Sequence, residues 1–292
     1  MTARESYFNP SSRSTAKSLI RLIVLALIAM VMGLPFFWMV LTSLKPFAEA
    51  EQTHLIPKQL QRDNYSVVLN LKSPREPGQD KLNIHFGRWY FNSIFIASWV
   101  TLLQLITSAM AAYAFSRLHW PGRDKVFLTY LSTMMIPGLM LMIPNYLIMV
   151  KLQLVNTYSG LIIPAAFSAF GTFLLRQFML SIPTSLDEAA QMDGASPWQI
   201  FTEIILPLSR PGIITLAIFT FLGNYASFFW PLIMIKDSWL YTLPIGMLTF
   251  DSTFGRQTHL LMAAAVMNVA PLIVLFVLLQ KHLVRGVQLK RP

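Results

Sequence analysis

Acidic side chains are rare in this chain, yet four of them fall in one short polar stretch. Asp187, Glu188, Asp193 and Glu203 lie within residues 185–213, which read SLDEAAQMDGASPWQIFTEIILPLSRPGI. Small residues and prolines separate the acids. Two uses of such a stretch are open. It could form a small acid-tipped helix that docks into a cleft on another protein, or an amphipathic hairpin that only seals a helical bundle.

The first half of this stretch carries the signals of a short helix. Ser185 and Glu188 have the spacing of a capping box, in which the serine hydroxyl accepts from the Glu188 amide and Glu188 reaches back. Asp187 and Glu188 also fall in the first turn, where acids suit the helix dipole. Gly194 can supply a left-handed C-terminal cap. The pattern predicts a helix over about 186–193.

A second helix should follow at once. Ser196 is a suitable N-cap, Pro197 suits the first helical position, and Gln199 completes another capping box. One apolar face follows, formed by Ile200, Phe201, Ile204 and Ile205. We expect this helix to end at Leu206-Pro207 and the next apolar segment to begin at Pro211. The stretch therefore predicts a helix, a sharp turn and a second helix.

The rest of the chain is apolar enough to lie in a membrane. Its 292 residues are 54% hydrophobic and only 12% charged, with a mean hydropathy of +0.53, whereas soluble domains carry about 25% charged residues. A helix needs about 20 apolar residues to cross the hydrocarbon core. Six uncharged runs are long enough: 22–44, 89–116, 126–150, 152–175, 211–235 and 257–280. The composition predicts an all-α, multi-pass membrane protein with six transmembrane helices in a single domain, 1–292.

Six spans place both termini on one side of the membrane. The basic residues that flank the first and last spans favour a cytoplasmic location for that side, although the basic residues of segment 45–88 argue the other way. With this orientation, segment 45–88 is an extracytoplasmic loop with one short helix, and segment 176–210 is cytoplasmic. The net charge of +10 is that of a membrane protein with basic loops, not of a nucleic-acid-binding protein.

The spans contain prolines and a few polar side chains. Prolines that interrupt membrane helices are common in transporters, where irregular backbone lines a pathway. Those inside or near the spans are Pro35, Pro137, Pro144, Pro164, Pro231 and Pro271. Polar and aromatic groups that could face a translocation path are Asn145, Tyr146, Asn224, Tyr225, Ser227 and Asn268. The same groups could instead form hydrogen bonds between helices.

Several kinds of chemistry have no motif in the sequence. The chain has no P-loop, no HExxH motif, no GxSxG motif and no cysteine, so we expect no catalytic residue and no metal site. The predicted spans also hold no Asp or Glu, whereas ion-driven carriers usually place carboxylates or histidines in the membrane. Any energy for transport should therefore come from another subunit.

The stretch EAAQMDGASPWQIFTEIILP resembles the EAA loop of binding-protein-dependent ABC importer permeases. The family pattern is EAA, three residues, Gly, nine residues and Ile-x-Leu-Pro. The matching positions are Glu188, Ala189, Ala190, Gly194, Ile204, Leu206 and Pro207. Other stretches resemble the carbohydrate branch of the family, of the maltose type, among them LPFFWMVLTSLK (34–45) and AYAFSRLHWPGR (112–123).

This resemblance implies a function and a set of partners. The first helix of the loop would be a coupling helix that docks into a cytoplasmic ABC ATPase dimer. The residues of that contact would be Glu188, Ala189, Ala190, Asp193, Gly194, Leu206 and Pro207. A second six-span permease subunit and an extracytoplasmic solute-binding protein would complete the importer, in a bacterial cytoplasmic membrane. ATP and Mg²⁺ would be bound by the ATPase subunits, so this chain would need no cofactor. A sugar or sugar-like solute would cross by alternating access.

The sequence departs from the resemblance at two places. Many sugar permeases carry Trp-Asn-Glu/Asp-Phe before Trp-Pro in the fifth span, where this chain has Tyr225-Ala226-Ser227-Phe228 before Trp230-Pro231. The common glycine-rich tail is replaced by LVRGVQLKRP. Two alternative functions stay open at this point: a subunit of an ion-coupled secondary transporter, and a membrane scaffold that transports nothing.

Overall fold

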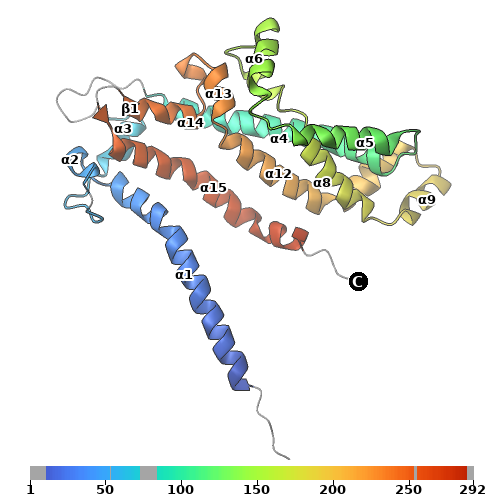
Figure 1. The fold of residues 1–292 in the computed structure, drawn as a ribbon, viewed down its shortest axis with the longest axis horizontal. Coiled ribbons are helices and arrows are strands. Elements are labelled where there is room, and N and C mark those ends of the chain that lie inside the picture. The colour runs from blue at the N-terminus through green and yellow to red at the C-terminus, as the bar shows by residue number, and fades with distance from the viewer. Residues whose placement is uncertain (1–10, 53, 73–83, 253–254, 288–292) are drawn as a thin grey trace, which may run out of the picture.

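The structure is a computed structural model that describes residues 11–52, 54–72, 84–252 and 255–287. Parts of the predicted 45–88 loop (53 and 73–83), of the N-terminus (1–10) and of the tail (288–292) lie outside these residues. The described chain is almost entirely helical, as predicted (Figure 1). The longer helices are α1 (Ser11–Ser43), α4 (Phe86–Ser116), α5 (Arg123–Ser132), α6 (Met142–Lys151), α8 (Ala169–Leu180), α9 (Ser185–Met192), α12 (Arg210–Tyr225) and α15 (Thr258–Val287).

Shorter elements connect these helices. They are α2 (Phe47–Ala50), α3 (Asp63–Val68), α7 (Tyr158–Ile162), α10 (Pro197–Gln199), α11 (Leu206–Leu208), α13 (Phe229–Met234) and α14 (Leu243–Gly246). A π-helical segment, Ile200–Ile205, joins α10 to α11. Three 3₁₀ turns cover Thr133–Met135, Ser238–Leu240 and Met247–Phe250. Two short strands, β1 (Asp251–Ser252) and β2 (Gly255–Arg256), pair in antiparallel register.

Three helices in the described chain are long and apolar enough to cross a membrane. They cover residues 18–43 of α1, the whole of α4 and residues 258–278 of α15. A fourth span results if residues 197–208 and α12, which meet at an angle of 75°, count as one. These helices overlap the predicted spans 22–44, 89–116, 257–280 and 211–235. The predicted count of six spans stays a prediction.

The two remaining predicted spans are not continuous helices. Within 126–150, α5 gives way to a 3₁₀ turn that ends at Met135, and Ile136 is extended (φ −84°, ψ 118°) because a following proline, Pro137, disfavours the helical conformation. Within 152–175, the chain turns at once, with Gln153 and Asn156 at φ 57° and 60°. Prolines alone do not decide such breaks, since α1 and α15 run straight through Pro35 and Pro271.

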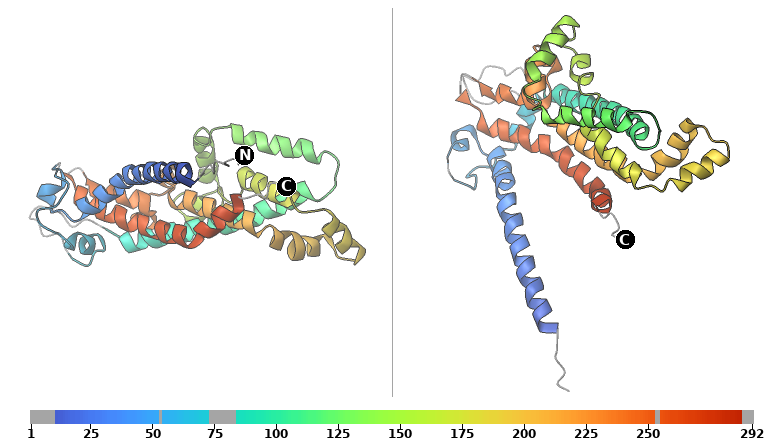
Figure 2. Two further views of the ribbon diagram at one scale, coloured as in Figure 1. Left: turned by 90° about the horizontal axis from the view of Figure 1, so that it is seen from below. Right: turned by 45° about the vertical axis from the view of Figure 1, so that its right-hand side comes forward.

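The central helices run side by side along the length of the molecule. α4 packs against α8 and α12, and α12 packs in turn against α15 (Figure 1). α1 contacts α15, but the N-terminal part of α1 stands away from the other helices in Figure 1 and in the right-hand view of Figure 2. Its apolar side chains are exposed, for example Met32 at 70%, as expected of a helix that faces lipid or another subunit rather than water.

The two ends of the bundle differ in character. Short helices α2 and α3 lie at one end and α9 lies at the other (Figure 1). At the first end, the side chain of Asn64 donates to the carbonyls of Ser43 and Lys45 and so fixes the end of α1 to the following segment. This segment contains two short helices among its described residues, where the sequence predicted one. At the other end, a buried apolar cluster that includes Leu175, Ile205 and Leu216 supports the polar stretch.

Candidate functional site

The acid-tipped helix exists where the sequence predicts it. α9 spans Ser185–Met192 and ends in a left-handed residue, Gly194, at φ +83°. The Gly194 amide donates to the Gln191 carbonyl (3.0 Å) and the Ala195 amide to the Ala190 carbonyl (2.9 Å). These two bonds define a Schellman motif, which satisfies the last helical carbonyls. The predicted helix and its glycine cap are both confirmed.

The predicted N-terminal capping box of α9 is wrong. Thr184, the residue before the helix, is already in helical conformation (φ −66°, ψ −23°) and its side chain makes no capping bond. The amides of Asp187 and Glu188 donate instead to the Thr184 carbonyl, at 2.9 and 3.1 Å. Because the helical turn begins one residue early, Ser185 lies inside the helix and its hydroxyl cannot cap it.

The second helix begins as predicted and ends at Leu208, one residue after the predicted Leu206-Pro207. Ser196 and Gln199 form the complete capping box: the Ser196 amide donates to Gln199 Oε1 at 2.8 Å, and the Gln199 amide donates to Ser196 Oγ at 3.3 Å. The helix then continues through Pro207 to Leu208. A proline ring clashes with the carbonyl four residues earlier in a regular α-helix. The wider π-helical segment just before Pro207 is a geometry that accommodates this proline.

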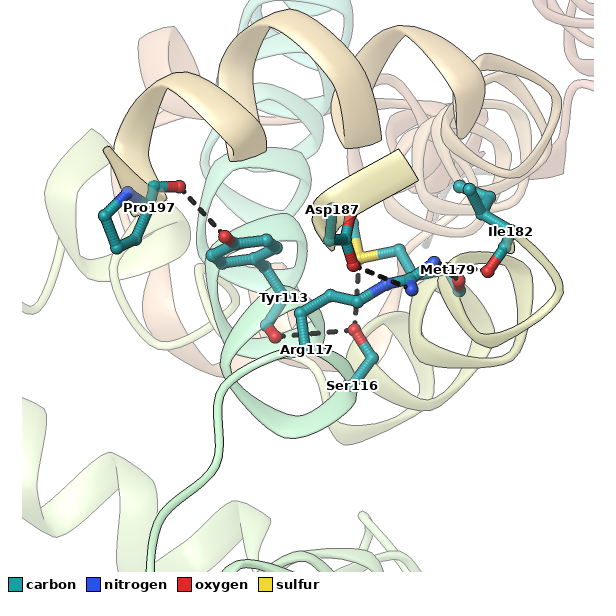
Figure 3. A network of polar contacts seen from close by, with 7 residues as sticks. All are labelled: Tyr113, Ser116, Arg117, Met179, Ile182, Asp187 and Pro197. Atoms are coloured by element: carbon teal, nitrogen blue, oxygen red, sulfur yellow. Dashed lines mark hydrogen bonds and ion pairs between the residues drawn. The ribbon is translucent and has the colours of Figure 1, made fainter. Parts of the chain in front are cut away.

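A buried ion pair fastens α9 to the end of α4. Arg117 Nη1 lies 2.9 Å from Asp187 Oδ2, and the two side chains are only 4% and 13% exposed. Arg117 Nη2 also donates to the carbonyls of Met179 (2.5 Å) and Ile182 (2.7 Å), as Figure 3 shows. The sequence pattern indicated only a helix-dipole role for Asp187 and did not indicate Arg117. The signal available was a lone arginine at the end of a long uncharged run.

A second contact joins α4 to the following helix of the same stretch. Tyr113, one turn before Arg117, donates its hydroxyl hydrogen to the Pro197 carbonyl at 2.9 Å (Figure 3). Its ring packs on that of Phe201, with centroids 5.0 Å apart. The end of α4 therefore touches both helices of the polar stretch, and these contacts hold the two helices in a fixed relation to α4.

The predicted coupling residues divide into an exposed group and a packed group. Glu188, Ala189, Asp193 and Gly194 are exposed at the tip of the stretch. The partly buried members are Ala190, Leu206 and Pro207. Two apolar side chains outside the predicted set are also exposed there, Met192 at 83% and Trp198 at 61%. The tip thus presents carboxylates beside apolar surface. The partly buried residues Ala190 and Leu206 pack the stretch against the bundle.

Towards the other end of the bundle lies a cavity of about 240 Å³. Three of the predicted pathway residues, Asn145, Asn224 and Ser227, line it. The other lining residues are Ser93, Ile96, Leu161, Pro164, Ala165, Trp230, Pro231 and Thr242. The lining offers amide and hydroxyl groups, a tryptophan and no ionisable side chain.

The other three predicted pathway residues, Tyr146, Tyr225 and Asn268, are not among the lining residues. Tyr146 packs against an apolar cluster that contains Met149 and Met234. Tyr225 is 1% exposed and donates its hydroxyl hydrogen to the Asn268 carbonyl at 3.2 Å. This bond joins α12 to α15. Tyr225 and Asn268 therefore form a hydrogen bond between helices, which was the alternative to a place on the translocation path. Within the described residues, no three His, Cys, Asp or Glu side chains could hold a metal ion together.

Comparison with known families assigns this architecture. Residues 104–289, which contain the polar stretch, both of its contacts with α4 and most of the cavity lining, match the family described as the binding-protein-dependent transport system inner membrane component. The chain belongs to this family. The predicted family is therefore confirmed, and the chain is a multi-pass transport permease of the inner membrane rather than an enzyme.

Relatives in this permease family are named for the transport of sugars and of sn-glycerol-3-phosphate. The chain is 33% identical to an arabinooligosaccharides transport permease of Halalkalibacterium halodurans, over 89% of this chain and 91% of the relative. It is 32% identical to a trehalose/maltose transport permease of Thermococcus litoralis, over 92% and 95% of the two chains. An sn-glycerol-3-phosphate transport permease of Rhizobium meliloti is also 32% identical, over 80% and 81%.

A solved structure shares the fold of this permease. A chain of a bacterial ABC transporter involved in the import of the acidic polysaccharide alginate superposes with a TM-score of 0.77. The match covers 94% of this chain and 99% of the other, at 24% identity. A second structure of a bacterial alginate ABC transporter, in complex with a periplasmic protein bound to an alginate pentasaccharide, matches with a TM-score of 0.57.

Proposed function

We propose that this permease is one of two membrane subunits of an ATP-driven importer that carries a sugar or sugar-like solute into the cell. A cytoplasmic ABC ATPase dimer, which binds ATP and Mg²⁺, would drive it. A second six-span permease would complete the pathway, and an extracytoplasmic solute-binding protein would deliver the solute. Both termini of this chain would lie in the cytoplasm, on the same side as α9.

The observation that carries this proposal is the exposed tip of α9. Its carboxylates and small residues leave a narrow, acid-tipped helix that a cleft with basic groups can accept. Ala189 has almost no side chain and Gly194 has none, so a partner can approach the backbone closely at both positions. The Schellman motif and the ion pair with Arg117 keep this helix in a defined position before any partner binds, which lowers the ordering cost of docking.

The cavity supports the assignment of a sugar-like solute. Sugars are recognised by hydrogen bonds from amides and hydroxyls and by contact with aromatic faces. Binding pockets typically combine apolar walls with a few such polar groups. Asn145, Asn224, Ser227 and Trp230 provide these groups in one place. The sugar transport named for the relatives agrees with this lining.

Reconstitution tests the proposal. The complete importer, reconstituted in proteoliposomes, consists of this chain, the partner permease, the ATPase and the binding protein. It should take up radiolabelled arabinooligosaccharide or maltose only when ATP is present on the side of the membrane that carries the ATPase. Uptake driven by a sodium or proton gradient without ATP would show an ion-coupled carrier instead. Assembly with the ATPase but no uptake of any sugar offered would favour a scaffold.

A further inference from the structure

The strongest unexplained feature of the permease is the buried guanidinium of Arg117. It lies just beyond the last residue of α4, and its three acceptors lie on three different parts of the chain. Met179 is near the end of α8, Ile182 is in the link that follows, and Asp187 is in α9. One side chain therefore joins α4, α8 and the coupling helix at a single point (Figure 3).

The burial of this pair makes the joint stiff. An exposed ion pair can open at little cost because water replaces each partner. Here both side chains are almost completely shielded, and separating them would leave an uncompensated charge in a poorly solvated site. Two of the bonds go to backbone carbonyls, so the joint restrains the main chain between α8 and α9 as well as the Asp187 side chain.

The far part of α4 reaches the cavity. Ser93 and Ile96 of α4 line it, and α4 is one continuous helix from Phe86 to Ser116. A rigid link at Arg117 would therefore carry any displacement of α9 directly to the cavity wall.

Two covalent routes also lead from α9 to the cavity. One runs back through the link at 181–184 and α8 to Pro164 and Ala165 of the lining, and the bonds of Arg117 to Met179 and Ile182 brace that link. The other passes through α10, the π-helical segment and α11, and then turns by 75° at Ser209 before α12 begins. The π-helical segment lacks the regular α-helical hydrogen-bond pattern, and the bend interrupts the helix axis, so this second route is less rigid than the continuous helix α4. Part of a displacement of α9 can be absorbed at these two places before it reaches α12.

We propose that Arg117 is a positioning residue that makes α4 and α9 move as one rigid body, with Asp187 as its partner. ATP-driven displacement of α9 then reaches the cavity through α4 rather than being absorbed in the π-helical segment and the bend. This inference rests on the proposed coupling of α9 to an ATPase. It assigns to the ion pair a role in transmission, beyond holding the loop in place.

Isosteric substitution of Asp187 tests this role. Asp187→Asn removes the charge while nearly keeping the side-chain shape, and Asp187→Glu restores a carboxylate at the same position. Glu203→Gln is the matched control, since it removes one exposed acid from the same stretch without touching the joint. The readout is the number of solute molecules taken up per ATP hydrolysed, measured on the assembled complex in proteoliposomes.

Asp187→Asn should lower this ratio by roughly tenfold, within the range of coupling factors between sites in allosteric proteins. ATP hydrolysis should continue at a rate close to that of the wild type. Asp187→Glu should recover most of the ratio, and Glu203→Gln should leave it unchanged. A purely structural role would instead lower uptake and hydrolysis together, through loss of assembled complex, and would leave the ratio unchanged.

A distance measurement supplies a second readout that does not depend on activity. The chain contains no cysteine, so spin labels can be placed at Ser185, an exposed residue of α9 outside the predicted ATPase contact, and at Phe91 on the exposed surface of α4. The distance between the labels should stay constant when ATP binds to the wild-type complex, and it should change or broaden in Asp187→Asn.

If Asp187→Asn takes up as many solute molecules per ATP hydrolysed as the wild type, and the distance between the labels is also unchanged, the proposed role of Arg117 is overturned. A parallel loss of uptake and hydrolysis at an unchanged ratio would also overturn it. Absence of any ATP-driven uptake by the wild-type complex would overturn the proposed function itself. The two failures are thus distinguishable.

Discussion

The turn after α9 gives the sharpest prediction, which concerns Gly194→Val. Gly194 has φ +83°, and a Cβ added there would meet no atom of the chain within 4 Å. The only internal penalty is the left-handed backbone, about 1–2 kcal/mol for an L-residue. That loss is small enough for the permease to fold and insert. In the complex, however, the branched side chain would stand between the tip of α9 and the ATPase.

The expected loss of binding to the ATPase follows from the exposed position of Gly194. Loss of one central interface contact removes about 2 kcal/mol or more of binding energy, which is roughly a thirtyfold loss of affinity. We therefore expect Gly194→Val to reach the membrane in normal amounts but to lose nearly all ATP-driven uptake. Gly194→Asn separates the two causes, because asparagine tolerates the left-handed conformation. It should unfold close to the wild-type temperature and still transport poorly.

Gly122 provides a matched control elsewhere in the chain. It also has φ +83° with no atom within 4 Å of an added Cβ, but it lies in the turn between α4 and α5. Gly122→Val carries the same backbone penalty and should keep most of its uptake. Full uptake by Gly194→Val would refute the docking argument. Equal loss in Gly122→Val would show that backbone strain, rather than contact with a partner, is responsible.

Three further predictions concern the joint, the bundle and the cavity. Tyr113→Phe removes the bond to Pro197 and should lower the free energy of unfolding by about 1 kcal/mol, measured by denaturation in detergent against the wild type. Gly246→Ala places a Cβ 2.2 to 2.9 Å from three atoms of the Trp89 ring, so overpacking should destabilise the protein by about 1–3 kcal/mol in the same assay; an unchanged melting temperature would contradict this packing. Asn224→Ala should raise the KM for solute uptake by about threefold to tenfold, the equivalent of one lost hydrogen bond, with little effect on basal ATP hydrolysis. An unchanged KM would remove Asn224 from the solute path.

The sequence predicted best those features that depend on neighbouring residues. The capping box of Ser196 and Gln199 and the left-handed Gly194 both involve groups within a few positions of each other, and both are confirmed. Ser185 and Glu188 carried the same local pattern, but the chain was already helical at Thr184. The local rule also could not indicate that α9 is held by Arg117, a residue 70 positions earlier.

Helix continuity and side-chain direction were harder to predict, for different reasons. Pro137 interrupts a helix and Pro271 does not, because the outcome depends on whether surrounding helices can accommodate the freed backbone groups, which the sequence does not contain. The different directions of the Asn224 and Tyr225 side chains were easier to predict from the sequence. Adjacent residues point about 100° apart on a helix, and here Asn224 lines the cavity while Tyr225 is directed towards α15.

The central claim is that this permease has no energy source of its own and is driven through α9. Cross-linking tests it most directly, since the cysteine-free chain allows a single cysteine in place of exposed Ala189. In membranes that contain the whole importer, Ala189→Cys should cross-link to the ATPase subunit, with a yield that changes when ATP binds. Gln59→Cys, in the exposed segment between α2 and α3 and expected outside the cell, should give no such product. A fully assembled, ATP-driven importer in which Ala189→Cys never cross-links to the ATPase would contradict the claim.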